Sequence, residues 1–283
     1  MPSILIAGCG YVGRATADIF HARGWQVEGW TASIESAAKL SEAGYPVHAI
    51  DISDAAAVRR STHQFDAVIH CASSGGGDEA AYRRIYFEGT QNLIAAFPDA
   101  RFLFTSSTSV YAQVDGSWVT EESAAEPTRE SAKILREAEA LVLSRSGIVA
   151  RLAGIYGPDR SVMLRNFLAG KSVIDSGSER FLNHAHRDDI ASALFSLIQG
   201  NVSGIYNVAD DQPISQRECL QWLASRLGRP IALSEATPAK RKRGDSNKRV
   251  SNAKLRAIGW APRFPTFQIA MEQSILPSFG IVH

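Results

Sequence analysis

A glycine-rich turn near the start of the chain constrains the fold more than any other feature of the sequence. Residues 4–7 form a short apolar run, and Gly8, Gly10 and Gly13 follow it in the spacing Gly-x-Gly-x-x-Gly. The next segment, 14–23, carries apolar residues that fit one face of a helix. In a dinucleotide site the first glycine makes the turn, the second admits the pyrophosphate, and the third lets the helix pack closely on the strand. We therefore predict a strand, turn and helix with phosphates held at the helix N-terminus. The alternative is a glycine turn that binds no ligand.

Composition narrows the class of protein. The chain has 283 residues and a formal net charge of +1, so we expect one large or two smaller domains and no general attraction to nucleic acid or membranes. Its three cysteines lie far apart, which favours a reducing compartment. No apolar run reaches the length of about 18 residues that a membrane span requires, and the chain opens on a predicted strand rather than a signal peptide. We expect a cytoplasmic protein that acts on a small molecule.

Strand-like and helix-like segments alternate through the first half of the chain. Strands are expected at 25–30, 47–50, 65–71, 101–105 and 148–152, with helices at 36–43 and 79–97 between them. Such alternation predicts an α/β fold, a doubly wound parallel sheet of the Rossmann type. Ligands of these sheets bind outside the carboxyl ends of the strands, which places 106–111 at the site.

The second half contains the remaining expected elements. They are strands at 180–186 and 204–208, a loop at 154–158, and helices at 163–168, 188–199, 216–227 and 251–259, with one more helix after 264. We expect a dinucleotide-binding domain at 1–155 plus about 184–208. A smaller, discontinuous substrate part at 156–183 and 209–283 would close over the carboxyl edge.

The residues after the second strand usually decide between NAD and NADP. An acid there binds the ribose 2′-hydroxyl of NAD, whereas an arginine suits the 2′-phosphate of NADP. This chain has Thr31 and Ser33 with no acid, and Arg14 lies nearby in sequence. The two hydroxyls would bind a phosphate, or Ser33 merely caps the following helix. The cofactor is therefore NADP or NAD, with NADP slightly preferred, and Asp51 would reach the adenine from the third strand.

Several short motifs, in order and spacing, resemble the extended short-chain dehydrogenase/reductase superfamily, in its NAD-dependent epimerase/dehydratase group. The matching stretches are 8–13, Asp51, 68–72, 106–111, 151–158, 186–191, 206–209 and 257–262. The resemblance implies NAD(P)-dependent oxidoreduction or epimerisation of a small hydroxyl or carbonyl compound, including nucleotide sugars. It also implies that Ser107 hydrogen-bonds the reacting oxygen.

In this family a Tyr-x-x-x-Lys motif follows on the next helix, and here the sequence departs from it. Lys133 occupies the lysine position, whose residue binds the nicotinamide ribose, but Arg129 stands in place of the tyrosine. An arginine stays protonated and cannot relay protons in the way of a phenol. The missing tyrosine would have to be replaced by Tyr111, by a water, or by Arg129 acting only electrostatically. The alternative for Arg129, Lys133 and Glu137 is a solvated helix stripe with an i,i+4 ion pair.

The residues that we predict to carry the site follow from these arguments. The catalytic candidates are Ser107, Lys133, Arg129 and Tyr111. The predicted cofactor-binding residues are Gly8, Gly10, Tyr11, Val12, Gly13, Arg14, Thr31, Ser33, Asp51, Ile52, Cys71, Ala72, Ser73, Ser106 and Lys133. Extended members also carry the pattern Gly-x-x-Gly-x-x-Gly, which would require glycine in place of Ala7. This difference and the arginine at position 129 both indicate an atypical branch of the superfamily. A non-catalytic NAD(P)-binding sensor or regulatory protein is the alternative function.

Three further features have more ordinary interpretations. His70, in a buried strand, is interpreted as a core histidine rather than a base. His184 and His186 share a face of their predicted strand, but two histidines without further ligands are a poor metal site, and no metal is expected. The basic run 240–243 is a solvated loop or a contact for a substrate diphosphate, with nucleic-acid binding disfavoured. The resemblance also suggests a homodimer through helices 79–97 and 127–145.

Overall fold

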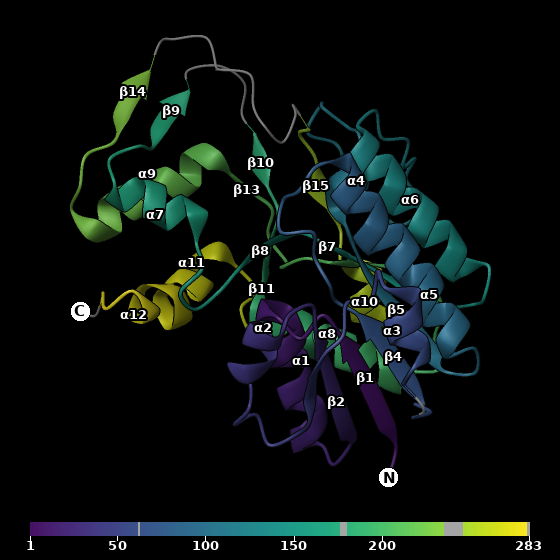
Figure 1. Cartoon of the computed structure of the whole chain (residues 1–283). Helices are drawn as coiled ribbons and strands as arrows, with labels where there is room; N and C mark the ends of the chain where they lie inside the picture. Colours follow the sequence, from purple (N-terminus) through teal and green to yellow (C-terminus); the bar gives the residue numbers. More distant parts are fainter. Residues whose placement is uncertain (62, 176–179, 235–245, 282–283) are drawn as a thin grey trace.

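A seven-stranded sheet forms the centre of the computed structural model, which describes residues 1–61, 63–175, 180–234 and 246–281 (Figure 1). All neighbouring strands are parallel, in the order β12-β7-β5-β4-β1-β2-β3. The strands are β1 (Ser3–Ala7), β2 (Gln26–Thr31), β3 (Val47–Ala49), β4 (Ala67–His70), β5 (Arg101–Ser107), β7 (Ile148–Leu152) and β12 (Gly204–Val208). The chain winds outward from β1 in both directions, which confirms the predicted doubly wound fold.

Helices cover both faces of this sheet. Figure 1 shows α1 (Tyr11–Ala22) beside α8 (Arg187–Gln199), and the two helices contact each other. Helices α4 (Glu79–Tyr82), α5 (Gly89–Ala96) and α6 (Glu130–Leu143) lie on the opposite face, while the short α2 (Ile34–Ala38) and α3 (Ala55–Arg59) follow β2 and β3. Strand β1 is apolar and fully buried from Ile4 to Ala7, because a strand covered on both faces has no side open to water.

The helix predicted at 79–97 contains a segment that the sequence did not indicate. Between α4 and α5, residues Arg83–Glu88 form a π-helical stretch, η1. A π segment shifts the register of the helical turns after it. After the shift, Gly89 and Thr90 are buried, and a Cβ on Gly89 would lie 2.7 Å from the Ile52 side chain.

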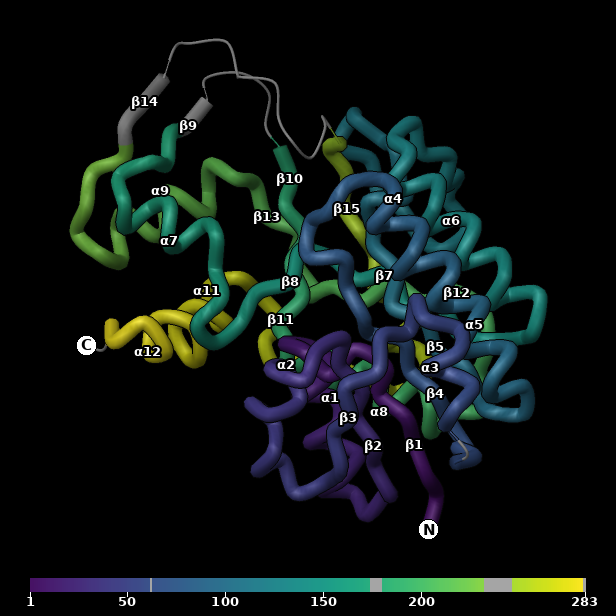
Figure 2. Tube along the Cα trace, viewed as in Figure 1, coloured from purple at the N-terminus to yellow at the C-terminus, as the bar shows by residue number. Residues whose placement is uncertain are grey.

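A second, smaller core lies beyond the carboxyl edge of the sheet (Figure 2). It is built by α7 (Val162–Leu168), α9 (Gln216–Leu227), α11 (Phe267–Ala270), η3 (Met271–Ile275) and α12 (Leu276–Ser278). Helix α9 begins with a capping box that Ser215 and Glu218 form. None of the helices in the described ranges is long and apolar enough to cross a membrane.

Four two-stranded sheets and two short helices connect the cores. The pairs are β8 (Gly154–Tyr156) with β11 (His184–His186), β10 (Phe181–Leu182) with β13 (Ile214–Ser215), β9 (Val173–Asp175) with β14 (Ala232–Ser234), and β6 (Trp118–Val119) with β15 (Arg249–Val250); the helices are η2 (Thr108–Val110) and α10 (Ala253–Ala257).

Two predictions in this region were wrong. The segment 154–158 is partly strand, and 180–186 is two strands with different partners. They are separated at Asn183, whose side chain bonds the backbone of Lys248 (2.9 Å) and Val250 (2.7 Å), while its carbonyl accepts the Gly154 amide at 2.9 Å. The basic run 240–243 lies outside the described residues.

Buried histidines predict how stability responds to acid. Burial lowers the pKa of His70 to about 3 and of His184 to about 4. The unfolded chain therefore binds more protons than the folded chain between about pH 6.5 and pH 4, so stability falls on acidification through that window. Each such histidine contributes a slope of at most about 1.4 kcal/mol per pH unit. Burial raises the pKa of Asp189 to about 6. Below that pH the folded chain binds a proton at this carboxyl, which offsets the loss of stability caused by one buried histidine.

Urea unfolding at pH 7 and pH 5 tests this expectation. His70→Leu should reduce the difference in unfolding free energy between the two pH values by about 2 kcal/mol. His21→Gln, at an exposed position, controls for the loss of a histidine as such. An unchanged pH dependence in the His70 variant would contradict the assignment.

Candidate functional site

The glycine turn after β1 is packed so closely that two of its glycines cannot be replaced. Gly8 has φ +98°, and a Cβ there would lie 2.1 Å from the Ala72 backbone nitrogen. A Cβ on Gly13 would lie 2.1 Å from the carbonyl oxygen of Gly8. The amides of Gly8 and Cys9 both donate to the Trp30 carbonyl, at 3.0 and 2.7 Å. These contacts fix the start of α1 against the carboxyl ends of β1, β2 and β4.

Gly10 is not tightly packed as Gly8 and Gly13 are, and this difference concerns the binding of a cofactor. Its position faces open space, since a Cβ added there would meet no atom within 4 Å, and no side chain caps α1 at this residue. The first-turn amides of α1, including those of Tyr11 and Val12, therefore face a gap that glycine keeps clear. A pyrophosphate fits a helix N-terminus of this kind.

The hydroxyls after β2 are used locally. Thr31 Oγ1 donates to the Ser33 carbonyl at 3.2 Å, and Ser33 Oγ accepts the Ser36 amide at 3.2 Å as the N-cap of α2. The capping interpretation of Ser33 is therefore confirmed. Arg14 is exposed and lies 3.9 Å from Asp18 on its own helix.

Asp51 and Ile52 lie at the carboxyl end of the neighbouring strand β3. Asp51 Oδ1 accepts the amide and the hydroxyl of Ser53, at 2.9 and 2.8 Å. Ile52 is buried beneath Gly89, and its carbonyl accepts Asn92 Nδ2 at 2.9 Å. The Ile52 side chain therefore belongs to the core, while the Asp51 carboxylate stabilises a turn at the sheet edge.

Residues 71–73 cross directly over the glycine turn. The Cys71 amide donates to the Ala7 carbonyl at 2.7 Å, and burial raises the pKa of the Cys71 thiol above its usual range. Ala72 is the residue against which Gly8 packs. Ser73 is exposed, and its Oγ accepts the Gly75 amide at 3.3 Å. Cys71 is thus a protonated core thiol at neutral pH.

The two serines at the end of β5 have different roles. Ser107 is half-buried, and its Oγ accepts the Ser109 amide at 3.1 Å as the N-cap of η2. Ser106 is buried and donates to Glu139 Oε1 at 2.6 Å. Because neighbours on a strand point to opposite faces of the sheet, the two side chains have different surroundings. The assignment of Ser106 to the cofactor is corrected, since its side chain points into the core.

A buried ion pair lies beneath this edge. Glu139 of α6 and Arg151 of β7 are 0% and 1% exposed, and Arg151 bonds both carboxylate oxygens, Nε to Oε1 at 3.0 Å and its terminal nitrogen to Oε2 at 2.6 Å. Arg136 also donates to Oε2. The Arg151 guanidinium lies 4.8 Å from the centre of the Tyr111 ring.

Tyr111 is held from several sides. It is fully buried, its hydroxyl donates to Asn207 Oδ1 at 2.9 Å, and burial raises the pKa of its phenol. The buried Lys248 ammonium donates to the Tyr111 carbonyl at 3.0 Å, and burial lowers the pKa of that lysine to about 8. A phenol so enclosed does not reach a substrate, so the suggestion that Tyr111 replaces the missing tyrosine is corrected. Lys248 was not anticipated, because its partner lies 137 residues away.

The helix that begins at Arg129 carries the remaining catalytic candidates. Arg129 is the exposed N-cap residue of α6. Lys133 Nζ lies 2.6 Å from Glu130 Oε1, and that bond raises the pKa of Lys133. Glu137 pairs instead with Arg83 at 2.9 Å. The expected i,i+4 pair is therefore wrong, and Lys133 uses the acid three residues before it.

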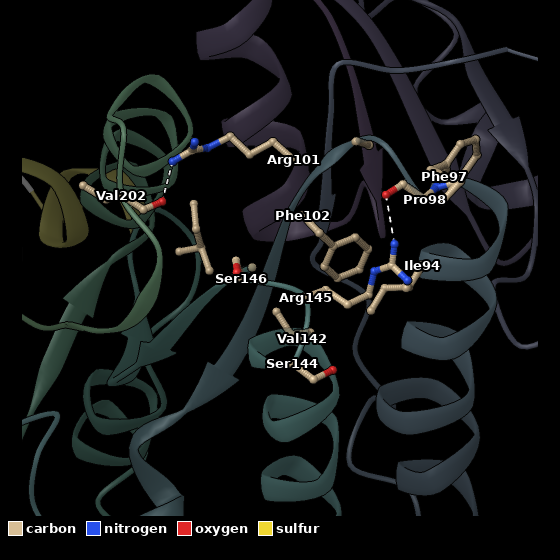
Figure 3. Close-up of a pocket in the computed structure, with 13 residues that line it drawn as sticks. Ile94, Phe97, Pro98, Arg101, Phe102, Val142, Ser144, Arg145, Ser146 and Val202 are labelled. Atoms are coloured by element: carbon tan, nitrogen blue, oxygen red, sulfur yellow. Dashed lines mark hydrogen bonds between the residues drawn. The ribbon is translucent and has the colours of Figure 1, made fainter.

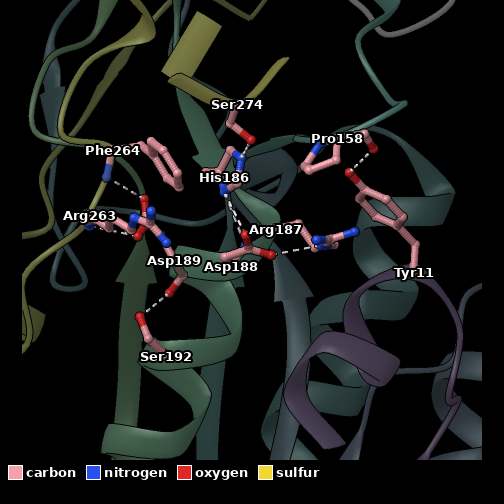
Figure 4. A network of polar contacts seen from close by, with 10 residues as sticks. All are labelled: Tyr11, Pro158, His186, Arg187, Asp188, Asp189, Ser192, Arg263, Phe264 and Ser274. Atoms are coloured by element: carbon pink, nitrogen blue, oxygen red, sulfur yellow. Dashed lines mark hydrogen bonds and ion pairs between the residues drawn. The ribbon is translucent and has the colours of Figure 1, made fainter. Parts of the chain in front are cut away.

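The histidines before α8 and the acids in its first turn connect the two cores (Figure 4). The Asp189 carboxylate accepts the amides of Arg263 (2.7 Å) and Phe264 (3.0 Å), and His186 Nε2 lies 2.9 Å from Ser274 Oγ. His184 is buried against other aromatic rings. In the described ranges, no group of three or more His, Cys, Asp or Glu could hold a metal ion.

A cavity of about 460 Å³ lies at the other edge of the sheet, at the amino ends of β5 and β7 (Figure 3). Two arginines in its wall are directed to backbone carbonyls: Arg101 donates to Val202 at 2.6 Å and Arg145 to Pro98 at 3.1 Å. This cavity is remote from the glycine turn, and its cations are occupied in capping chain segments.

Residues 4–209 match the model of the NAD dependent epimerase/dehydratase family. The chain belongs to this family. Two curated proteins are similar to it. Protein YeeZ of Escherichia coli K12 is 30% identical over 222 residues, which cover 74% of this chain and 77% of that protein. The dTDP-4-dehydrorhamnose reductase of Mycolicibacterium smegmatis is 28% identical over 223 residues, which cover 73% of this chain and 64% of that protein.

Several solved structures share the fold of this chain. UDP-glucose 4-epimerase of Thermotoga maritima superposes with a TM-score of 0.85 at 17% identity, over 98% of both chains. The dTDP-glucose 4,6-dehydratase of Bacillus anthracis, solved with NAD, gives a TM-score of 0.82 at 16% identity, over 99% of this chain and 97% of that one. At these identities the likeness concerns the fold, and it agrees with the resemblance inferred from the motifs.

The glycine turn of this family member predicts a contrast between two substitutions. Gly13→Ala should destabilise the fold by about 3 kcal/mol, because its methyl meets the Gly8 carbonyl. Gly10→Ala meets no protein atom, so its thermal unfolding should change little while NADH affinity falls. Calorimetry and a nicotinamide fluorescence titration measure the two effects. Equal destabilisation by both alanines would contradict the assigned roles.

The buried ion pair predicts a second contrast, within α6. Glu139→Gln leaves the Arg151 charge buried without its counter-ion, and should cost about 3–5 kcal/mol of unfolding free energy. Glu137→Gln removes an exposed pair and should cost at most about 1 kcal/mol. Urea unfolding of both variants checks the difference, and a small loss in the Glu139 variant would show that the pair is not structural.

Proposed function

We propose that this chain binds NADP or NAD at the glycine turn and uses it in the oxidoreduction or epimerisation of a small hydroxyl or carbonyl compound, with nucleotide sugars as the leading substrate class. The observation that carries the proposal is the open space at Gly10 beside an uncapped helix N-terminus, at the same sheet edge as Ser107. The names of two similar proteins, a dTDP-4-dehydrorhamnose reductase and a UDP-glucose 4-epimerase, support the substrate class.

Each residue of the proposed site has a definite task. The glycine turn and the α1 amides hold the pyrophosphate, and the bound nicotinamide supplies or accepts a hydride. Ser107 holds the reacting oxygen by a hydrogen bond, for which its hydroxyl is available beyond its bond to Ser109. Lys133 binds the ribose by exchanging its Glu130 partner for hydroxyls. Because Arg129 remains protonated and Tyr111 is enclosed, a water takes the role of the proton carrier, near the positive charge of Arg129.

The second candidate is a cofactor-binding sensor without turnover. Two observations favour it: an arginine stands at the tyrosine position, and the Lys133 ammonium is already paired with Glu130 at 2.6 Å. Both candidates require the dinucleotide. We propose a slight preference for NADP, because β2 ends on Thr31 without an acid for the ribose hydroxyl.

A cofactor titration and one variant separate the candidates. Wild-type protein should enhance the fluorescence of NADPH or NADH on binding, and binding of neither form would remove both candidates. Arg129→Tyr should reduce the turnover of an enzyme that relies on the arginine, whereas in a sensor it should create activity on simple carbonyls.

The role of Ser107 is tested once a substrate has been found with that cofactor. Ser107→Ala should lower kcat by roughly 100-fold and leave cofactor affinity unchanged, because the hydroxyl stabilises charge that develops on the reacting oxygen. Ser144→Ala, at the far end of α6, is the matched control. If both alanines leave kcat alike, Ser107 has no part in the reaction.

A further inference from the structure

The side chain of Tyr11, the first residue of α1, lies close to two arginines. The Arg160 guanidinium carbon is 5.0 Å from the centre of the ring, and that of Arg187 is 5.1 Å from it. The Tyr11 hydroxyl donates to the Pro158 carbonyl at 2.9 Å, as Figure 4 shows. A guanidinium at this distance from an aromatic ring is attracted to its face. Tyr11 thus places two cations beside the glycine turn.

Arg160 is held there by a tight turn. The backbone groups of Gly157 and Arg160 bond each other in both directions at 3.0 Å, and Asp159 between them has φ +60°. The Asp159 amide donates to Ser278 Oγ at 2.9 Å, and Arg165 donates to the Asp159 carbonyl. A non-glycine residue at positive φ costs free energy and persists only where its surroundings determine it.

The loop that carries Arg160 packs closely against Tyr11 and Arg187 at Gly157. A Cβ on Gly157 would lie 2.6 Å from the Tyr11 hydroxyl and 3.1 Å from Arg187 Cβ, so only glycine fits there. Arg187 Nε lies 2.8 Å from Asp188 Oδ1, which neutralises that cation. Arg160 is exposed, and the described residues give it no carboxylate partner within ion-pair distance. Arg160 is therefore the cation of the stack whose guanidinium has no carboxylate at ion-pair distance within the described ranges, while the Asp159 carboxylate also acts on the Tyr11 ring.

We propose that Arg160, oriented on the Tyr11 ring near Arg187, binds a phosphate group of the ligand proposed for the glycine turn. This inference rests on the proposed function for the position of the ligand. A guanidinium edge matches phosphate oxygens in a two-pronged hydrogen bond, and a guanidinium that stacks on a ring keeps the hydrogen-bonding capacity of that edge. The phosphate belongs to the dinucleotide or to a phosphorylated substrate beside it.

The simpler alternative is that the stack only joins the loop 157–160 to the glycine turn. The Tyr11–Pro158 hydrogen bond would suffice for that task, and the charge of Arg160 would then be irrelevant to ligands. Removing the charge while keeping an apolar side chain of similar length distinguishes the two. Arg23 provides the matched control, because it is an exposed arginine at the other end of α1 and lies 5.1 Å from the Phe195 ring.

The experiment compares wild type, Arg160→Met and Arg23→Met. NADH binding is followed by fluorescence, and inorganic pyrophosphate binding by calorimetry, with and without saturating NADH. Loss of one charged hydrogen-bonding group should weaken the affected ligand roughly tenfold, and should reduce the salt dependence of its binding. Arg23→Met should bind both ligands like wild type, and all three proteins should unfold at similar temperatures.

The outcomes separate the sources of the phosphate. Weaker NADH binding in Arg160→Met assigns the contact to the cofactor. Unchanged NADH binding with weaker pyrophosphate binding in the NADH-loaded protein assigns it to the substrate. If Arg160→Met matches Arg23→Met for both ligands, the proposal is overturned. A wild-type protein that binds pyrophosphate through Arg160 but neither NADH nor NADPH would overturn the proposed function and leave the phosphate site standing.

Discussion

The buried carboxylate of Glu139 holds helix α6 and strands β5 and β7 together at the sheet edge where the candidate site lies. It joins α6 to β7 through Arg151 and to β5 through Ser106, and Arg151 in turn packs on Tyr111. Charges this deep are tolerated only when they are paired and hydrogen-bonded, so the three elements cannot shift separately. The end of β5, which presents Ser107, and the first turn of α6, which presents Arg129 and Lys133, are consequently fixed relative to each other.

The sequence was sufficient for features that local backbone chemistry determines. The apolar runs at β1 and β4 predicted strands covered on both faces, and the alternation with helices then left few topologies. The spacing predicted a turn at Gly8 and close packing at Gly13, which the lack of room for a Cβ at each confirms, while the role of Gly10 toward a pyrophosphate stays a prediction. The helix predicted at 216–227 likewise has the bounds of α9.

Contacts between side chains that are far apart in the sequence could not be predicted in this way. Ser106 and Ser107 are adjacent and chemically identical, and only the position of Glu139 decides which one faces the core. Tyr111 finds Asn207 96 residues later, and the Tyr11 ring finds Arg160 through a turn in the second half of the chain. The division of 180–186 into two strands depended on where the backbone of 248–250 would lie.

Arg129 and Arg160 lie near helix N-termini, where the helix dipole opposes a positive charge. A cation at a helix N-terminus is opposed by the helix dipole, and α6 begins at Arg129 with no side-chain cap. Glu130 in the first turn offsets that cost only partly, because it also serves Lys133. Arg160 similarly lies beside the positive end of α1, over Tyr11. An anion bound at the N-terminus of α1 would stabilise Arg160 in this position, and a phosphate-bearing dinucleotide is an anion of that kind.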